Sequence, residues 1–313
     1  MFQLLYLQFT APSFSEDGFN TLMKRYDAML ANQMTDPDFI FSQTLMNTMY
    51  GNSYRRQQLT PELLASIKLE HMAEIHKQLF SNAADFRFTF VGNMKPEELK
   101  PLVEKYIGSL PTAKKAGNVY TDDKVRPVKG GVTNDFRVKM EQPKVSVFFA
   151  YTGAKQMTMK NMMVANYLTT ALDNRYLKSI REEKGGTYGV SVRVALAPRT
   201  NEYVMQVQFD TNEQMADELA AIVVAEIEKI AAEGPLQEDM DKTREFLLKD
   251  YKKNIENNGW GENTLRLYYD YGVDYLNDYE AAINGVTSAD VQALAKRMLD
   301  EKSMVKVIMR PEK

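Results

Sequence analysis

The chain has 313 residues, of which 44% are hydrophobic and 26% charged, so it is long enough to form two globular domains. A formal net charge of −3 gives no basic surface for nucleic acid, and no apolar run reaches the roughly 18 residues that a bilayer requires, so we expect neither nucleic acid nor a membrane as a partner. The absence of cysteine excludes disulfides and thiol chemistry, and it is compatible with both the cytoplasm and a bacterial periplasm.

The first part of the chain predicts helices followed by a strand. An acidic pair at 16–17 opens a long amphipathic pattern after Pro12, where negative charge suits the helix dipole. Downstream, the sequence HMAEIH (71–76) contains both histidines of the chain. A helix presents two zinc ligands at positions i and i+4, but His71 and His76 are five residues apart and point to different sides. We therefore expect both histidines on the solvent-exposed face of a structural helix, without a metal.

An internal repeat relates the first part of the chain to the last. At an offset of 219 residues, six apolar positions coincide without a gap, with Leu64, Ile67, Met72, Ile75, Leu79 and Phe80 falling on Ile283, Val286, Val291, Leu294, Met298 and Leu299. At the same offset, segment 86–92 falls on 305–311, and the alternation in each predicts a strand that follows the helix. Two copies of one α/β unit are therefore predicted.

The second copy contains about 90 residues, from 132 to 222, that the first copy lacks. This insert predicts two strands on either side of Pro143, a long helix over 159–185 that ends at a glycine pair, and a hairpin formed by 188–196 and 202–209. We expect an α+β fold made of two-layer α/β sandwich units with mainly antiparallel sheets.

These patterns also predict the domains. Residues 132–313 form a complete domain, and residues 1–112 form the C-terminal part of another that lacks its first 90 to 110 residues, roughly the length of the insert. The first unit is thus expected to be incomplete at its N-terminus. Between them, residues 113–131 are polar, contain glycine and lack periodicity, which is typical of a linker.

The segment IREEKGGTYG (180–189) is the main candidate for a functional site. Arg181 lies in the last turn of the predicted helix, Gly185 and Gly186 end that helix, and Tyr188 lies near the start of the next strand. Each residue also has an ordinary structural explanation, because arginine complements the helix dipole, glycine caps a helix and tyrosine packs in strands. The glycines match neither of the common phosphate-binding patterns, so a nucleotide loop is excluded.

Arg181 and Tyr188, seven residues apart across a glycine turn, resemble an element in the C-terminal half of the pitrilysin/insulinase family of zinc peptidases. Segment 49–111 resembles the end of one domain of that family, with Tyr-Gly, a threonine before a short helix, a helix that precedes Val-Gly-Asn, and a final helix that ends in YIGSLP. The resemblance covers nearly the whole chain. It implies the fold shared by pitrilysin and the processing peptidases, with the later part of the third domain followed by a complete fourth domain.

The resemblance also implies where the metal lies. In this family an H-x-x-E-H motif and a downstream glutamate hold zinc in the first domain. That motif is absent here, and Ala28 and Met29 stand where the metal-bearing domain would have glutamates. We therefore expect no metal ligand and no cofactor in this chain, and zinc in an N-terminal half that belongs to the same polypeptide or to a partner subunit.

By the same resemblance, Arg181 binds a backbone carbonyl of a peptide substrate, and Tyr188 donates its phenol O–H to the oxyanion of the tetrahedral intermediate. The implied function is the non-catalytic C-terminal half of a zinc metalloendopeptidase, which binds extended peptides and is inactive alone. The alternative is a structural, non-proteolytic core subunit of the same fold. The presence of Arg181 and Tyr188 at the family's spacing favours the peptidase interpretation.

Overall fold

The structure is a computed structural model that describes residues 1–113, 115, 117 and 120–312. Contacts divide the chain into two compact units, of which unit 1 comprises Met1–Thr35 and Gln58–Asp123, and unit 2 comprises Asp36–Gln57 and Lys124–Lys313. Helices and one mixed β-sheet build these units, which confirms the predicted α+β fold class. None of the described helices combines the length and the apolar character needed to span a membrane.

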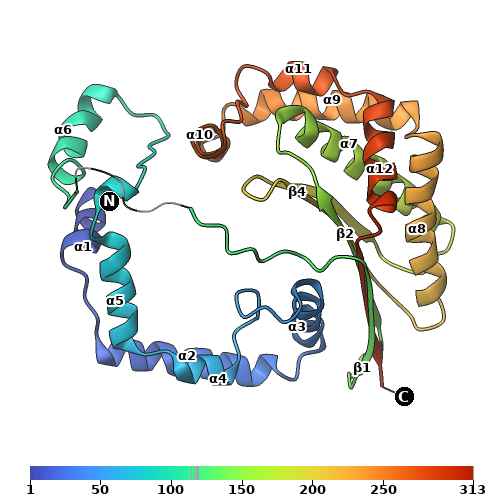
Figure 1. Ribbon diagram of the computed structural model, residues 1–313, viewed down its shortest axis with the longest axis horizontal. Helices are drawn as coiled ribbons and strands as arrows, with labels where there is room; N and C mark the ends of the chain where they lie inside the picture. Colours follow the sequence, from blue (N-terminus) through green and yellow to red (C-terminus); the bar gives the residue numbers. More distant parts are fainter. Residues whose placement is uncertain (114, 116, 118–119, 313) are drawn as a thin grey trace. The chain divides into compact units, whose positions relative to one another are not determined.

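Unit 2 contains a five-stranded sheet with the strand order β1-β5-β2-β4-β3 (Figure 1). The strands are β1 (Gly131–Val138), β2 (Val145–Ala154), β3 (Val190–Ala197), β4 (Glu202–Thr211) and β5 (Met304–Pro311). Only β1 and β5 are parallel, and the other neighbours are antiparallel, so the prediction of a mainly antiparallel sheet is confirmed. β3 and β4 form the predicted hairpin, and β3 lies at the edge of the sheet.

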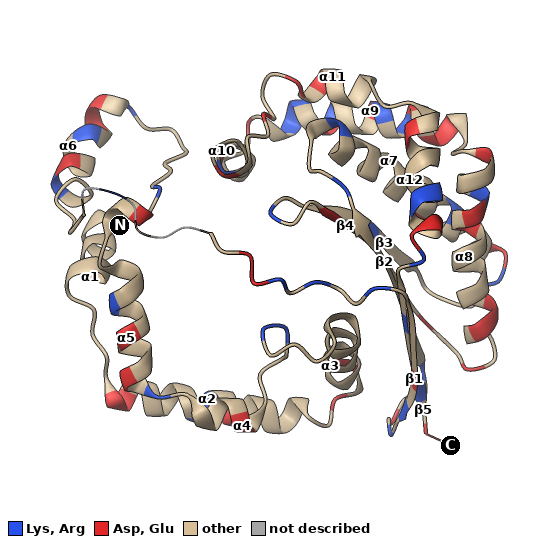
Figure 2. Ribbon diagram, viewed as in Figure 1, with Lys and Arg blue, Asp and Glu red and all other residues tan. Residues whose placement is uncertain are grey.

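One face of this sheet is covered by helices α7 (Met159–Tyr176), α8 (Ala216–Glu233) and α12 (Ser288–Asp300), as Figure 1 shows. Apolar side chains of the strands and helices form one large core, which includes Val147, Phe149, Val207, Leu172, Val223 and Leu294. Helices α9 (Gln237–Asn254), α10 (Asn258–Tyr271) and α11 (Tyr279–Asn284) belong to the same unit. Basic and acidic residues both occur along α8, α9 and α12 (Figure 2), where they form pairs such as Lys242–Glu238 at 2.6 Å.

The opposite face of the sheet is covered in part by α3 (Pro37–Tyr50). Asp36 caps this helix by accepting hydrogen bonds from the backbone N–H groups of Asp38 and Phe39. Phe41 and Met49 of α3 pack against a second apolar cluster that includes Phe148, Ala150, Val305, Val307 and Met309. Helices on both faces explain why β2 is a nearly continuous apolar run rather than an alternating one, because both sides of a central strand are buried.

Unit 1 is helical, with α1 (Phe2–Thr10), α2 (Glu16–Gln33), α4 (Pro61–Ser66), α5 (Leu69–Phe80), the short 3₁₀ turn η1 (Ala83–Asp85) and α6 (Pro96–Tyr106). As predicted, the acidic pair at 16–17 begins a long helix, and the hydroxyl of Ser15 accepts a hydrogen bond from the N–H of Gly18. The strand predicted at 86–92 does not form, whereas its repeat partner 305–311 lies within β5. A strand needs a neighbour to pair its backbone groups, and the described residues of unit 1 contain no other strand.

Four of the six repeated apolar positions differ sharply in burial between the two units, whereas Leu64 and its partner Ile283 are both buried. In unit 1, the exposed fractions of Ile67, Met72, Ile75 and Leu79 are 36%, 39%, 42% and 49%, whereas those of their partners Val286, Val291, Leu294 and Met298 are 2%, 0%, 1% and 1%. The pattern is the same, but among the described residues only those of unit 2 form a sheet on which these side chains can pack. The helical periodicity therefore indicates an apolar face in both copies, and burial of that face depends on the presence of a sheet.

The predicted domain boundaries remain a prediction, because contacts within one chain do not establish which segments fold independently. The described contacts group residues 36–57, which contain α3, with unit 2 rather than with the helices that flank them in sequence. Of the predicted linker, residues 114, 116, 118 and 119 lie outside the described part of the chain.

Buried tyrosines should make unit 2 unstable in alkali. Burial, together with the charge of Glu228, raises the pKa of Tyr151 to about 12, and burial also raises the pKa of Tyr176 and Tyr203. An unfolded tyrosine titrates near pH 10, so between pH 10 and 12 the unfolded chain loses protons that the folded chain keeps. The free energy of unfolding should therefore fall as the pH rises through this range, by on the order of 2 to 3 kcal/mol for Tyr151 alone.

Urea denaturation between pH 9 and 11.5, followed by tyrosinate absorbance and circular dichroism, measures this effect. The variant Tyr151→Phe should show a shallower decline, because it removes one of the titrating groups. A free energy of unfolding that stays constant over this pH range would contradict the prediction.

Candidate functional site

The main candidate site lies where α7 connects to β3. Helix α7 begins at Met159, where the Thr158 hydroxyl accepts a hydrogen bond from the N–H of Asn161, and continues into a π-helical turn, η2 (Leu177–Glu182). The π-turn is closed by a hydrogen bond from the N–H of Glu183 to the carbonyl of Lys178, five residues earlier, at 3.0 Å. Such turns insert one extra residue into a helix and are frequent at functional sites.

Arg181 lies in this π-turn and is exposed, next to the fully buried Ile180. Its guanidinium forms no ion pair with any residue that the structure describes, although its backbone carbonyl accepts a hydrogen bond from the N–H of Gly185 at 3.0 Å. Gly185 has a φ of 62°, the left-handed conformation with which many helices end. The helix therefore ends at Glu182, one short turn before the predicted glycine pair, and Arg181 is exposed.

Tyr188 is fully exposed, with a relative exposure of 101%. On either side of it, the Thr187 hydroxyl donates a hydrogen bond to the carbonyl of Gly189 at 3.0 Å and accepts one from the N–H of the same residue at 3.2 Å. β3 begins two residues after Tyr188, and a surface hollow of about 520 Å³ is lined there by residues of β3 and β4, including Val190, Ser191, Gln208 and Asp210. Arg181 thus lies in η2 and Tyr188 on the connection from η2 to β3, and both side chains are exposed.

The two histidines are arranged differently from each other. His71 is exposed, with its Nδ1 atom 3.5 Å from a carboxylate oxygen of Glu74. His76 is half-buried rather than fully solvated, because its ring stacks on Phe80 at 4.3 Å and meets the edge of Phe14 at 5.5 Å. The described residues contain no group of three or more potential His, Asp or Glu ligands. A zinc ion needs converging ligands, so these two histidines do not fit one.

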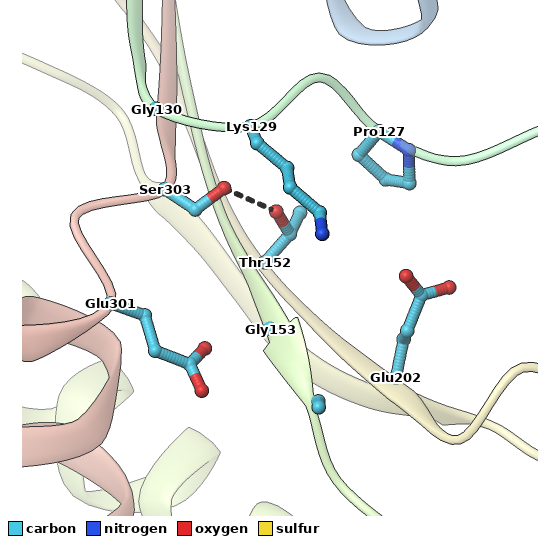
Figure 3. Close-up of a pocket in the computed structure, with 9 residues that line it drawn as sticks. Pro127, Lys129, Gly130, Thr152, Gly153, Glu202, Glu301 and Ser303 are labelled. Atoms are coloured by element: carbon cyan, nitrogen blue, oxygen red, sulfur yellow. Dashed lines mark hydrogen bonds between the residues drawn. The ribbon is translucent and has the colours of Figure 1, made fainter.

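A separate pocket of about 300 Å³ lies at the other end of β4 (Figure 3). Nine residue steps along β4 separate it from the candidate site, about 30 Å at the rise of an extended strand. Its two carboxylates are paired within the protein. Glu202 contacts Arg126 at 3.1 Å, and Glu301 accepts hydrogen bonds from Tyr203 at 2.8 Å and from Arg297 at 2.7 Å. Both carboxylates therefore have partners within the protein, which gives them a structural role.

Comparison with known proteins identifies the family of this chain. The family described as the peptidase M16 inactive domain matches residues 66–247, more than half of the chain. The chain belongs to this family. It is 24% identical over 285 residues to a zinc protease PQQL-like protein of Arabidopsis thaliana, covering 85% of this chain and 29% of that protein. It is also 23% identical over 262 residues to the probable zinc protease PqqL of Escherichia coli (strain K12), covering 82% of this chain and 26% of that protein.

The fold agrees with a solved member of the family. The crystal structure of the periplasmic protease PqqL from Escherichia coli matches 99% of this chain and 34% of its own, with a TM-score of 0.85 and 19% sequence identity. The resemblance to pitrilysin-type zinc peptidases that the sequence indicated is thereby confirmed. The chain spans only about a third or less of the length of these relatives.

Sequence reasoning selected Arg181 and Tyr188 but not the residues that hold their connection in place. Thr211 ends β4, 25 residues away from Gly186, and yet its hydroxyl donates a hydrogen bond to the Gly186 carbonyl at 2.6 Å. No local pattern in the sequence marks such a contact, because it depends on the pairing of the sheet.

Proposed function

We propose that this M16 chain is the non-catalytic half of a zinc endopeptidase, which binds an extended peptide and contributes Arg181 and Tyr188 to an active site shared with a zinc-bearing N-terminal half. The proposal rests on the exposure of the Arg181 and Tyr188 side chains. Tyr188 is fully exposed on the connection between η2 and β3, and Arg181 is exposed in η2. No described side chain pairs with either polar group. Polar groups held on a surface without an internal partner are free to meet a ligand.

The chemistry of the pair suits a peptide undergoing hydrolysis. The planar guanidinium of Arg181 presents several N–H donors, which can bind backbone carbonyl groups of an extended peptide whatever its side chains are. The phenol of Tyr188 is a neutral O–H donor, which can stabilise negative charge as it develops on the carbonyl oxygen. Zinc, when bound by the partner half, supplies the Lewis acid and the activated water. His71 and His76 do not fit that metal, so this chain contributes hydrogen-bond donors only.

A structural, non-proteolytic core subunit of the same fold is the alternative function. Its support is the large core of unit 2, which is sufficient for a scaffold without any active site. The two functions differ in what they require of Tyr188, because a scaffold has no use for a fully exposed tyrosine that packs against nothing.

Complementation of the zinc-bearing half tests the proposed function. An unstructured fluorogenic peptide is incubated with the zinc-bearing half, with this chain, and with both together. We expect no hydrolysis by this chain alone and a clear gain in rate when both are present, because the donors of Arg181 and Tyr188 then reach the reacting carbonyl. Formation of a stable complex without any gain in rate would favour the structural alternative.

A further inference from the structure

The connection between η2 and β3 is held by contacts of very unequal strength. Lys184 pairs with Glu218 at 2.5 Å, but both side chains are largely exposed, and exposed ion pairs stabilise little. The Thr187 hydroxyl bonds only to the neighbouring Gly189, so it shapes the turn without attaching it to the rest of unit 2. The hydrogen bond from Thr211 to Gly186 is the contact that joins the connection to the sheet.

Thr211 is well suited to act as a fixed anchor. Its exposed fraction is 8%, and it pairs across the sheet with Val145, which is fully buried at the start of β2. Its hydroxyl donates to the Gly186 carbonyl at 2.6 Å, a short distance for a hydrogen bond between two oxygen atoms. The hydrogen bond therefore attaches the connection to β4, which lies between β2 and β3 in the sheet.

Gly186 is held from the other side by the start of α8. A Cβ atom at this position would lie 2.6 Å from the methyl carbon of Met215 and 2.9 Å from a methyl of Leu219. The backbone of Gly186 thus lies between the Thr211 hydroxyl and these two side chains. A side chain at this position would have to displace the flexible ends of Met215 and Leu219.

Two residues further along, Tyr188 has no contact of its own that could fix it. The exposed ring turns freely about χ1 and χ2, so the connection can fix only the point from which the side chain extends. That point is set by the backbone, which is attached to the sheet at Gly186. A hydrogen-bond donor that stabilises an oxyanion must be held in place before the reaction, and a displacement of about 1 Å can cost a factor of about 10² in rate.

We propose that Thr211 is a positioning residue, which through its hydrogen bond to Gly186 holds the backbone from which Tyr188 extends. This inference rests on the proposed function, in which Tyr188 is the oxyanion donor. The proposed role does not require Thr211 to contact the substrate. Its removal should therefore change the order of the connection and the turnover number together, and leave the affinity for peptide almost unchanged.

The test compares Thr211→Val with Thr211→Ser, which restores the hydroxyl. In the chain alone, hydrogen exchange of amides 184–190 should become roughly tenfold faster in Thr211→Val, as expected for the loss of one anchoring hydrogen bond, and return to normal in Thr211→Ser. With the zinc-bearing half present, kcat should fall about ten- to hundredfold in Thr211→Val while KM stays within about twofold, because the donor acts only in the transition state. Thr211→Ser should recover kcat.

Thr152→Val is the matched control. Thr152 has the same exposed fraction of 8%, and its hydroxyl is hydrogen-bonded to that of Ser303 at 3.0 Å, near the opposite end of β2. This variant also loses a buried hydroxyl, but both the exchange at 184–190 and kcat should remain unchanged. Should Thr211→Val fail to fold, Thr211→Ala also removes the hydroxyl that bonds to Gly186, and it should show the same faster exchange and lower kcat.

The outcomes separate the two proposals. Unchanged exchange in Thr211→Val, or unchanged kcat in a setting where Tyr188→Phe lowers it, overturns the positioning role. If Tyr188→Phe itself leaves turnover unchanged, the proposed function fails, and the exchange measurement still decides whether Thr211 holds the connection.

Discussion

Replacing Tyr188 by phenylalanine is expected to lower the turnover of an unstructured peptide by about 10² to 10³, the usual cost of removing one oxyanion donor. The change removes a single oxygen atom from a side chain that is fully exposed and packs against nothing, so the stability of unit 2 should not change. KM should change little, because the donor meets its charge only in the transition state. The measurement is steady-state hydrolysis with the zinc-bearing half present.

Arg181→Ala should behave differently in the same assay. A donor that binds a carbonyl of the peptide in the ground state contributes to affinity, so its loss should raise KM as well as lower kcat/KM. Tyr268→Phe is a suitable control, because Tyr268 is a half-exposed tyrosine on α10 rather than on the connection, and it should leave all constants unchanged. Full activity in both Tyr188→Phe and Arg181→Ala would make the structural alternative the better explanation.

Glutamate substitutions at two positions that the repeat relates should differ greatly in how much they destabilise the protein. Leu294 in α12 has an exposed fraction of 1% and lies in the large core of unit 2, whereas its partner Ile75 in α5 has an exposed fraction of 42%. Leu294→Glu removes buried apolar contacts and places a carboxylate in the core, so it should cost more than about 4 kcal/mol. That is a large share of the roughly 5 to 15 kcal/mol that stabilises a typical domain, so unit 2 should largely unfold.

Ile75→Glu should change the free energy of unfolding by no more than about 0.5 kcal/mol, as is usual for an exposed position. Thermal denaturation followed by circular dichroism and calorimetry distinguishes the two variants, and hydrogen exchange locates the affected unit. A loss of stability in Ile75→Glu as large as that in Leu294→Glu would show that the apolar face of α5 is covered in solution.

Much of the fold could be predicted from local patterns. The glycine pair after Arg181, the hairpin of β3 and β4, and the apolar run of β2 each follow from the preferences of a few neighbouring residues. The strand predicted at 86–92 failed because alternation shows only that a segment can pair, and pairing needs a second strand. The prediction for His76 was incomplete. Its stacking partner Phe80 lies one turn further along the same helix and was open to prediction from spacing, whereas the edge contact with Phe14 depends on how the chain folds back onto α5.

For the candidate site, too, some features could be predicted from the sequence and others could not. Residue type and spacing selected Arg181 and Tyr188, since a guanidinium and a phenol are the donors that the proposed chemistry needs. Their exposure, the π-turn that carries Arg181 and the attachment of Gly186 to Thr211 follow from contacts between residues far apart in sequence. Such contacts leave no trace in a local pattern.

By itself, the sequence determined the helices, the glycine turn, the internal repeat and the resemblance to zinc peptidases, because each depends on residues that are close together or on a pattern that survives without a partner. Only the tertiary structure decided that α5 keeps an exposed apolar face while α12 buries the equivalent one, and that Tyr188 extends into solvent from a connection anchored to the sheet. The physical reason is that burial and position depend on which surfaces meet, and the same amphipathic helix is stable against a sheet and bare without one.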